Sequence, residues 1–412
     1  MRATRVKAKM QAAAAAGGGT GPSAPSKETI EILKQLIGFR TVSRHSNLDL
    51  IEWVRAYLSG FGIASHLIYD GGRSRANLFA TIGDGRRGGL VLSGHTDVVA
   101  VDGQEWSTDP FEAVAKDERI YGRGAADMKG FIAAVLADIP QMLTARRAEP
   151  LHLALSFDEE VGCIGVRSLI GRLAALGIAP QGCIIGEPTE MRVVVGYKGS
   201  GVYRCTVHGR EMHSSLAPQG VNAIEYAALL ILKLREIQDR LRRSEPKHDG
   251  FDIRYTTVNP GSVQGGLASN VVAGDCEFRF DIRHLPWTAA EGIVAELETF
   301  ARDELLPEMH EIAPEAAIQF VRMGDVPAMQ TDADTRLVRD VQRLAGDREP
   351  AGYVGFGTEA GLFQKAGIPT VVCGPGSIAQ AHRPDDFITF QQLAQCEAFL
   401  RRLTNADDIG AR

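Results

Sequence analysis

Short apolar runs alternate with amphipathic stretches over the first half of this 412-residue chain, and this alternation limits the folds that the chain can adopt. The apolar runs, which we interpret as strands, are 77–82, 90–92, 151–157 and 183–185. The stretches with apolar residues at helical spacing are 48–58, 131–143 and 166–176. Buried strands that alternate with helices are typical of parallel sheets. The pattern predicts an α/β domain whose mixed, largely parallel sheet is flanked by helices.

The pattern changes after residue 195 and returns near residue 325, which predicts an insertion. Strand-like segments and two long helical stretches follow one another in between, at 203–207, 223–241, 255–258, 276–282 and 289–305. Such runs favour an α+β domain. We therefore expect 27–195 and 325–412 to form one domain, interrupted by an inserted domain at 196–324. The basic, acid-free segment 1–26 is interpreted as a disordered tail, with an upstream extension or a targeting segment as alternatives.

The amino-acid composition limits the classes of partner that the protein is expected to bind. With 44% hydrophobic and 23% charged residues the chain is typical of a soluble globular protein, and its net charge of -6 argues against nucleic acid or a membrane as the partner. A small-molecule substrate is expected instead. The six cysteines are far apart and form no CxxC pair. This spacing favours reduced, buried thiols in a cytoplasmic protein over a disulfide scaffold.

Five potential metal ligands are scattered along the chain, and we interpret each as lying where a predicted strand runs into a loop. They are His95, Asp127, Glu160, Glu187 and His382. Imidazole nitrogens and carboxylate oxygens suit Zn²⁺ and its neighbours, and one carboxylate can bridge two cations. Each of the five residues, taken alone, could have a structural role instead of binding metal. Five such residues at successive strand ends, however, indicate a site for two divalent metal ions.

The neighbours of these residues suggest further roles and alternatives. Asp97 lies two positions after His95 on the same side of a predicted strand, where its carboxylate could orient the imidazole. Asp127 stands at a probable helix start and could simply be an N-cap. Glu159 and Glu160 follow a buried strand, so one could bind metal while the other serves as a general base; a solvated acidic loop is the alternative.

Taken together, these motifs resemble a family of two-metal amidohydrolases that includes acetylornithine deacetylase, succinyl-diaminopimelate desuccinylase, aminoacylase and glutamate carboxypeptidase. The resemblance covers residues 28–401. The segments 374–384, with the sequence GPGSIAQAHRP, and 357–360, with the sequence GTEA, are most similar to acetylornithine deacetylases. The family pattern is a metallopeptidase-type catalytic domain interrupted by a lid and dimerisation domain.

The resemblance implies a role for each residue. Asp127 would bridge two cations, Zn²⁺ or Co²⁺, with His95 and Glu187 on one and Glu160 and His382 on the other. Glu159 would be the general base and Asp97 would orient His95. In the inserted domain, His213 would stabilise the oxyanion, often in the active site of a partner subunit, so a homodimer is expected. Asn270 and Arg283 would bind the substrate carboxylate.

The function implied is hydrolysis of the amide bond of an N-acyl amino acid by a hydroxide held between the metals, with Glu159 moving the proton. N2-acetyl-L-ornithine, cleaved to L-ornithine and acetate in arginine biosynthesis, is the leading substrate. Another N-acyl amino acid hydrolase, a succinyl-diaminopimelate desuccinylase or a dipeptidase or carboxypeptidase of this family is the alternative. A non-catalytic scaffold is disfavoured because the base and all five ligands are present. A serine or cysteine hydrolase is disfavoured because no Gly-x-Ser-x-Gly motif occurs.

Overall fold

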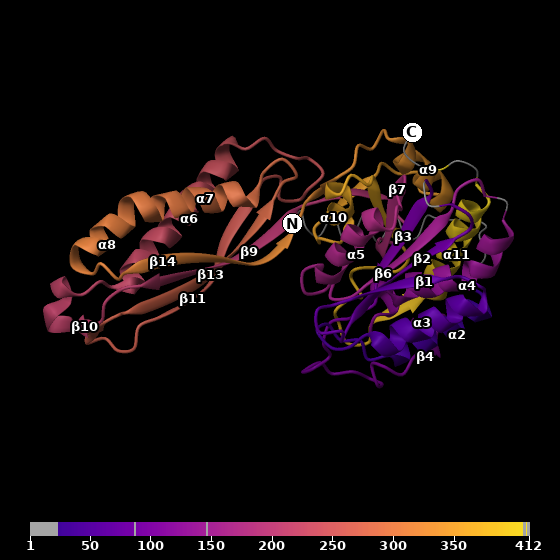
Figure 1. The fold of residues 1–412 in the computed structure, drawn as a ribbon, viewed down its shortest axis with the longest axis horizontal. Coiled ribbons are helices and arrows are strands. Elements are labelled where there is room, and N and C mark those ends of the chain that lie inside the picture. The colour runs from indigo at the N-terminus through magenta and orange to yellow at the C-terminus, as the bar shows by residue number, and fades with distance from the viewer. Residues whose placement is uncertain (1–23, 86–87, 146, 407–408, 410–412) are drawn as a thin grey trace.

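The computed structural model describes residues 24–85, 88–145, 147–406 and 409. Figure 1 shows two bodies joined by a narrow connection, one built on a large sheet and the other on a smaller sheet with long helices. The 1–26 tail predicted from the sequence lies almost entirely outside the described residues.

The large sheet has nine strands, and its central part is parallel. Strand order is β1-β2-β6-β3-β7-β17-β8-β15, with β16 paired to β8. Neighbours from β6 to β17 run parallel, whereas the pairs β1-β2, β2-β6, β17-β8 and β8-β15 are antiparallel. The bounds are β1 Ser65–Tyr69, β2 Ala76–Ile82, β3 Leu90–His95, β6 Leu151–Ser156, β7 Gly182–Pro188, β8 Val194–Tyr197, β15 Met329–Gln330, β16 Gly352–Val354 and β17 Thr370–Gly374. The predicted α/β class with a mixed, largely parallel sheet is confirmed.

Helices cover both faces of this sheet, which explains why its central strands β3, β6, β7 and β17 are buried along their whole length. In β3, Leu90 and Leu92 pack on one face and Val91 on the other, because successive side chains in a strand point to opposite sides. On the first face lie α2 Lys27–Gly38, α3 Leu48–Gly60, α4 Gly130–Thr144, α9 Arg336–Ala345 and α11 Phe390–Thr404. On the second lie α5 Ile164–Ala175 and α10 Ala360–Lys365.

The smaller body, which we name the lid, has a sheet that is covered on one face only. Its strand order is β11-β13-β9-β14, all antiparallel. Along β13, Phe278, Phe280 and Ile282 are buried in the lid's own core, whereas Arg279 and Arg283 alternate with them and face outward. The bounds are β9 Gly199–His208, β11 Thr257–Gly265, β13 Asp275–His284, β14 Ala317–Val326, α6 Ala223–Ser244, α7 Ala290–Phe300 and α8 Leu306–Ile312. The domain limits drawn from the sequence remain a prediction.

Two small sheets complete the described structure. One joins β4 Val114–Lys116, β5 Arg119–Tyr121 and β18 Phe387–Thr389, and it ties the C-terminal region to the segment before α4. The other pairs β10 Met212–His213 with β12 Val271–Val272. Figure 1 shows β10 at the end of the lid that is farthest from the large sheet.

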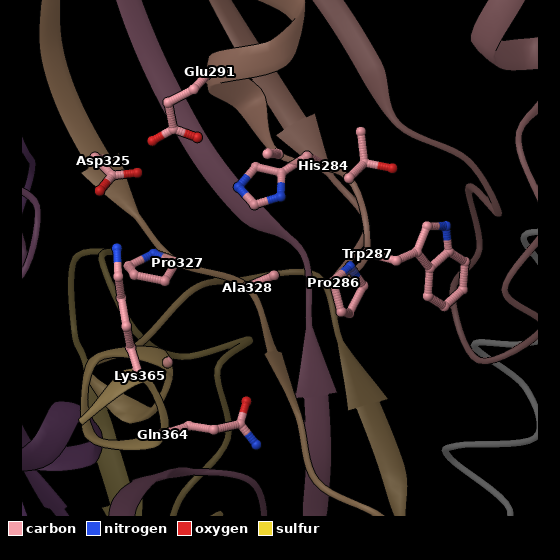
Figure 2. Close-up of a pocket in the computed structure, with 12 residues that line it drawn as sticks. His284, Pro286, Trp287, Glu291, Asp325, Pro327, Ala328, Gln364 and Lys365 are labelled. Carbon is pink, nitrogen blue, oxygen red and sulfur yellow. The ribbon is translucent and has the colours of Figure 1, made fainter. Parts of the chain in front are cut away.

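The junction between the two bodies is tightly packed and borders a pocket. A Cβ atom on Gly199, the first residue of β9, would lie only 2.1 Å from Nε2 of His284, so glycine is needed where the chain enters the lid. A pocket of about 340 Å³ lies beside His284 (Figure 2) and is lined by Trp287 and Glu291 of the lid and by Lys365 of the larger body. None of its lining residues belongs to the predicted metal site.

All six cysteines fall within the described residues and are buried, with no disulfide among them. No described helix is long and apolar enough to cross a membrane.

A buried carboxyl group between α4 and α11 should make stability depend on pH. Asp138 is 4% exposed and accepts a hydrogen bond from the Thr404 hydroxyl at 3.0 Å, and burial raises the pKa of Asp138 to about 6. The folded state therefore holds this proton more tightly than the unfolded state, so stability falls as pH rises through the window from about 4 to about 6. The shift corresponds to about 3 kcal/mol.

We expect Asp138→Asn to remove most of this pH dependence and to raise the thermal midpoint at pH 8 more than at pH 5. Melting curves of metal-free protein at both values would test this. Asp49→Asn, which changes an exposed residue in the first turn of α3, is the control. An equal effect of Asp138→Asn at pH 5 and pH 8 would contradict the expectation.

Candidate metal centre

Three adjacent parallel strands deliver four of the candidate residues to one edge of the large sheet. His95 is the last residue of β3, Glu187 lies near the end of β7, and Glu159 and Glu160 follow β6. These strands are neighbours in the order β6-β3-β7 and run parallel, so their carboxyl ends meet. In open α/β sheets this is the edge where functional sites form.

Asp127 and His382 reach the same place from outside the strands, which differs from the expectation that every ligand ends a strand. Asp127 lies in the turn Ala125–Lys129 before α4, with φ -121° and ψ 94°, and it is not the N-cap of that helix. Its carboxylate is drawn to two imidazoles and so is not used to cap the helix. His382 lies in the loop between β17 and β18, eight residues beyond the end of β17.

Asp127 lies between the two histidines, with one carboxylate oxygen toward each. Its Oδ1 is 2.9 Å from Nε2 of His95, and its Oδ2 is 3.4 Å from Nε2 of His382. Each histidine also approaches a different glutamate: His95 is 3.8 Å from Oε1 of Glu187, and His382 is 3.0 Å from Oε2 of Glu160. The five side chains thus form two groups that share Asp127.

Burial and mutual repulsion make the carboxylates of this cluster hard to ionise. Burial raises the pKa of Glu187 well above its ordinary value, and the charge of Asp127 raises it further. Burial likewise raises the pKa of Glu159, against the opposing charge of His95, and Glu160 adds repulsion. Four acidic side chains are therefore crowded where water is scarce, and positive charge is needed to stabilise their ionised forms.

The histidines supply part of that positive charge. Burial opposes ionisation of Asp127, but hydrogen bonds with His382 and His95 outweigh it and lower the pKa of Asp127. Hydrogen bonds to Asp127 and Glu160 raise the pKa of His382 to about 10. Metal ions displace protons from imidazole ligands. The side chains of this cluster that hold protons in the absence of metal are therefore the ones that would bind cations.

The donor set fits divalent cations. Ligand atoms of His95, Asp127 and Glu160 lie within 4.8 Å of one another, and so do those of His95, Glu159 and Glu187. Mixed nitrogen and oxygen donors suit Zn²⁺ and Co²⁺. Two divalent cations would balance the four carboxylates in charge.

Asp97 holds the loop that carries Glu159 more closely than it holds the imidazole of His95. Nδ1 of His95 lies 2.9 Å from the backbone oxygen of Asp97 and 3.7 Å from its Oδ1. The Asp97 carboxylate instead accepts hydrogen bonds from the backbone N–H of Glu159 at 3.0 Å and from the Ser43 hydroxyl at 2.7 Å. The orienting contact expected from the sequence is therefore made by the main chain.

Glu159 is oriented by its neighbours, and the preceding acid points elsewhere. The Cys163 thiol donates to Oε1 of Glu159 at 3.2 Å. Asp158 is ion-paired with Arg75 and accepts from the backbone N–H of Arg44 at 2.6 Å. Only Glu159 and Glu160 of the three consecutive acids therefore belong to the cluster.

The lid residues of the predicted site do not join this cluster. His213 and Asn270 lie together, since His213 pairs with Val271 between β10 and β12 at the far end of the lid in Figure 1. Arg283 lies at the opposite end of β13, where its Nε donates to Asp281 at 3.0 Å. The three are exposed and lie in two separate places on the lid.

Two buried groups beside the cluster were not recognised in the sequence, although one of them lies in the segment 357–360 that was considered there. Glu359, within 357–360, accepts hydrogen bonds from the hydroxyls of Ser93 and Ser156, on β3 and β6. Arg123, within the segment before Asp127, forms an ion pair with Asp386 at 3.4 Å. In the sequence, each of these two residues is an isolated charged residue inside a glycine-containing segment. Such a segment has no helical or strand periodicity from which burial could be predicted.

Comparison with known proteins identifies the family. Residues 91–406 match the model of peptidase family M20/M25/M40. Acetylornithine deacetylase of Pasteurella multocida is 35% identical over 359 residues, which cover 87% of this chain and 91% of the relative.

Solved structures give the same fold. Aminopeptidase PepT of Bacillus cereus has a TM-score of 0.71 at 20% identity. The match covers 93% of this chain and 99% of the aminopeptidase chain. A Bacillus subtilis protein described as a dinuclear metal-binding peptidase of the M20 family has a TM-score of 0.63 at 15% identity. The match covers 92% of this chain and 96% of the Bacillus subtilis chain. The chain therefore belongs to peptidase family M20/M25/M40 and is a metal-dependent amidohydrolase.

Proposed function

We propose that this enzyme hydrolyses the amide bond of an N-acyl amino acid, with N2-acetyl-L-ornithine as its principal substrate and L-ornithine and acetate as products. The observation that carries the proposal is the placement of Asp127, with one carboxylate oxygen toward each of two histidines that each approach a separate glutamate. The relatives named acetylornithine deacetylase support the choice of substrate.

In the proposed mechanism, two divalent cations, Zn²⁺ or Co²⁺, would be held by the pairs His95–Glu187 and His382–Glu160, with Asp127 between the two pairs as a further ligand. When bound, the cations polarise the acyl carbonyl and make water acidic enough to ionise near neutral pH. Glu159 accepts the proton of the attacking water. The water oxygen adds to the acyl carbon, the C–N bond breaks, and Glu159 returns the proton to the amine nitrogen.

We further propose that the enzyme is a cytoplasmic homodimer whose lids exchange His213 between active sites. Ile224 and Leu232 on α6 and Val263 on β11 are exposed apolar residues, and α6 packs beside β11. A surface of this kind favours association of two copies. In the arrangement of Figure 1, β10 lies far from the large sheet of its own chain, which favours a role in a partner's site. Asn270 and Arg283 are proposed to bind the substrate carboxylate.

A substrate panel would test the function. We expect Zn²⁺- or Co²⁺-loaded protein to release amine from N2-acetyl-L-ornithine with a kcat/KM at least tenfold above those for succinyl-diaminopimelate, acetyl-methionine and simple dipeptides. Amine release would be measured with ninhydrin, with metal content determined on the same preparation. Metal-stripped protein that regains activity with Zn²⁺ or Co²⁺ is the control. A preference for acetyl-methionine would overturn the ornithine assignment and leave the amidohydrolase chemistry in place.

A further inference from the structure

The loop that carries His382 has no regular structure to hold it in place. His382 has a φ of 64°, in the left-handed region that residues other than glycine rarely adopt. Its side chain is 50% exposed, in contrast to the buried His95. A ligand in such a loop needs contacts from elsewhere in the chain to fix it opposite Glu160.

Those contacts come from two segments that precede α4. Nε2 of Gln104 donates to the backbone oxygen of His382 at 3.1 Å, and Nη1 of Arg123 donates to the backbone oxygen of Arg383 at 3.2 Å. Nη2 of Arg123 also donates to Oε1 of Gln104 at 2.5 Å, so the two side chains act together. The carbonyl groups of the two consecutive peptide units on either side of Arg383 are therefore held by one linked pair.

Arg123 is itself fixed in the interior. It is 1% exposed, its guanidinium lies 4.9 Å from the ring centre of Trp106, and it forms an ion pair with Asp386, which is also 1% exposed. Burying a charged pair carries a desolvation cost and is weak evidence of a role in stability alone. Its geometry is suited to holding several acceptors at once, because a guanidinium presents several N–H donors in a fixed plane.

Asp386 connects this pair to the other side of the candidate centre. Its Oδ2 accepts from the backbone N–H of Gly124 at 2.8 Å, and its Oδ1 accepts from that of Ala126 at 3.4 Å. Both residues lie in the segment that leads into Asp127. Arg123 and Asp386 therefore join the segment that presents Asp127 to the loop that presents His382.

We infer that Arg123 is a positioning residue that acts with Gln104 and Asp386 to hold His382 beside Glu160, and so sets the affinity for the second of the two cations. The inference rests on the proposed metal centre. It concerns the group formed by Asp127, Glu160 and His382, because the hydrogen bonds described above go to the loop that carries His382 and to the segment before Asp127.

The test is Zn²⁺ binding to metal-stripped full-length protein, measured by equilibrium dialysis with metal analysis. Wild-type protein is expected to bind two equivalents. Arg123→Lys keeps the positive charge but loses the planar guanidinium group with its several N–H donors. We therefore expect the first Zn²⁺ equivalent to bind as in wild type and the second to bind about 10- to 100-fold more weakly. Arg119→Lys is the matched control, because Arg119 packs on Phe387 in the adjoining small sheet, where its Nη1 donates to the Tyr121 hydroxyl at 3.3 Å. It should bind both equivalents normally.

A second variant separates positioning from folding. Gln104→Glu keeps an oxygen that can accept from Arg123 and loses the N–H donor to His382. It should therefore weaken binding of the second Zn²⁺ equivalent while leaving the melting temperature of metal-free protein unchanged. Wild-type affinity for both equivalents in Gln104→Glu and in folded Arg123→Lys would overturn the inference, as would equal weakening of both equivalents. Wild-type protein that binds no Zn²⁺ would overturn the proposed metal centre, and the inference with it.

Discussion

Replacing Glu159 by glutamine is expected to lower kcat about 10²- to 10⁴-fold, the range that general acid–base groups contribute. Glutamine keeps the size of the side chain and an oxygen that can accept from the Cys163 thiol, which lies 3.2 Å from Oε1 of Glu159 in the wild type. It cannot take a proton from water near neutral pH. Because the loss affects proton transfer, KM for N2-acetyl-L-ornithine should change little.

Metal content must be measured on the same preparation, because Glu159 lies close enough to His95 and Glu187 to bind a cation itself. Two metal equivalents with low kcat would agree with the role of general base. Loss of one equivalent would make Glu159 a ligand instead. Full turnover in Glu159→Gln would exclude it from both roles.

Asp158→Asn is a matched control for this experiment. Asp158 is the adjacent acid in the same loop, but its carboxylate is paired with Arg75 and with the backbone N–H of Arg44. Its removal should leave kcat within a few-fold of wild type. A loss as large as that of Glu159→Gln would mean that the loop, and not the base, had been disturbed.

The fold class could be predicted because its signal is local and periodic. Leu90, Val91 and Leu92 form an apolar run since both faces of β3 are covered, and this pattern distinguishes a buried central strand from an edge strand. Strands β4, β5 and β18 were not predicted. Each has only three residues and is defined by its partners in the small sheet, so its own sequence carries too little pattern.

Within the candidate site, sequence could propose residue types and strand ends but not the contacts between distant loops. Asp97 was expected to meet the imidazole of His95 with its carboxylate, and the structure uses its backbone oxygen instead, because the carboxylate accepts from Glu159 N–H and Ser43. The link from Gln104 to His382 joins residues 278 positions apart and follows no spacing rule. The roles assigned to the ligands stay predictions until metal binding is measured.

Mixing two inactive variants is expected to restore activity if His213 serves the active site of a partner subunit. His213→Ala should be nearly inactive, because removing one oxyanion-stabilising donor typically costs about 10²- to 10³-fold in kcat. Glu159→Gln is inactive for a different reason and keeps an intact lid. In a mixed dimer, the lid of the Glu159→Gln subunit would supply His213 to the catalytic body of the His213→Ala subunit, which still has Glu159.

The recovery expected is about one quarter of wild-type activity, because random exchange makes half of the dimers mixed and each mixed dimer has one complete site. Subunits would be exchanged by mild denaturation and refolding of a 1:1 mixture, and kcat per site compared with each variant treated alone. Mixing His213→Ala with wild-type protein controls for losses during exchange. If His213 acts within its own chain, each mixed dimer contains two sites that each lack one group, so activity stays at the level of the separate variants. That result would also require the lid to bring β10 back across the distance seen in Figure 1 to the carboxyl edge of its own large sheet.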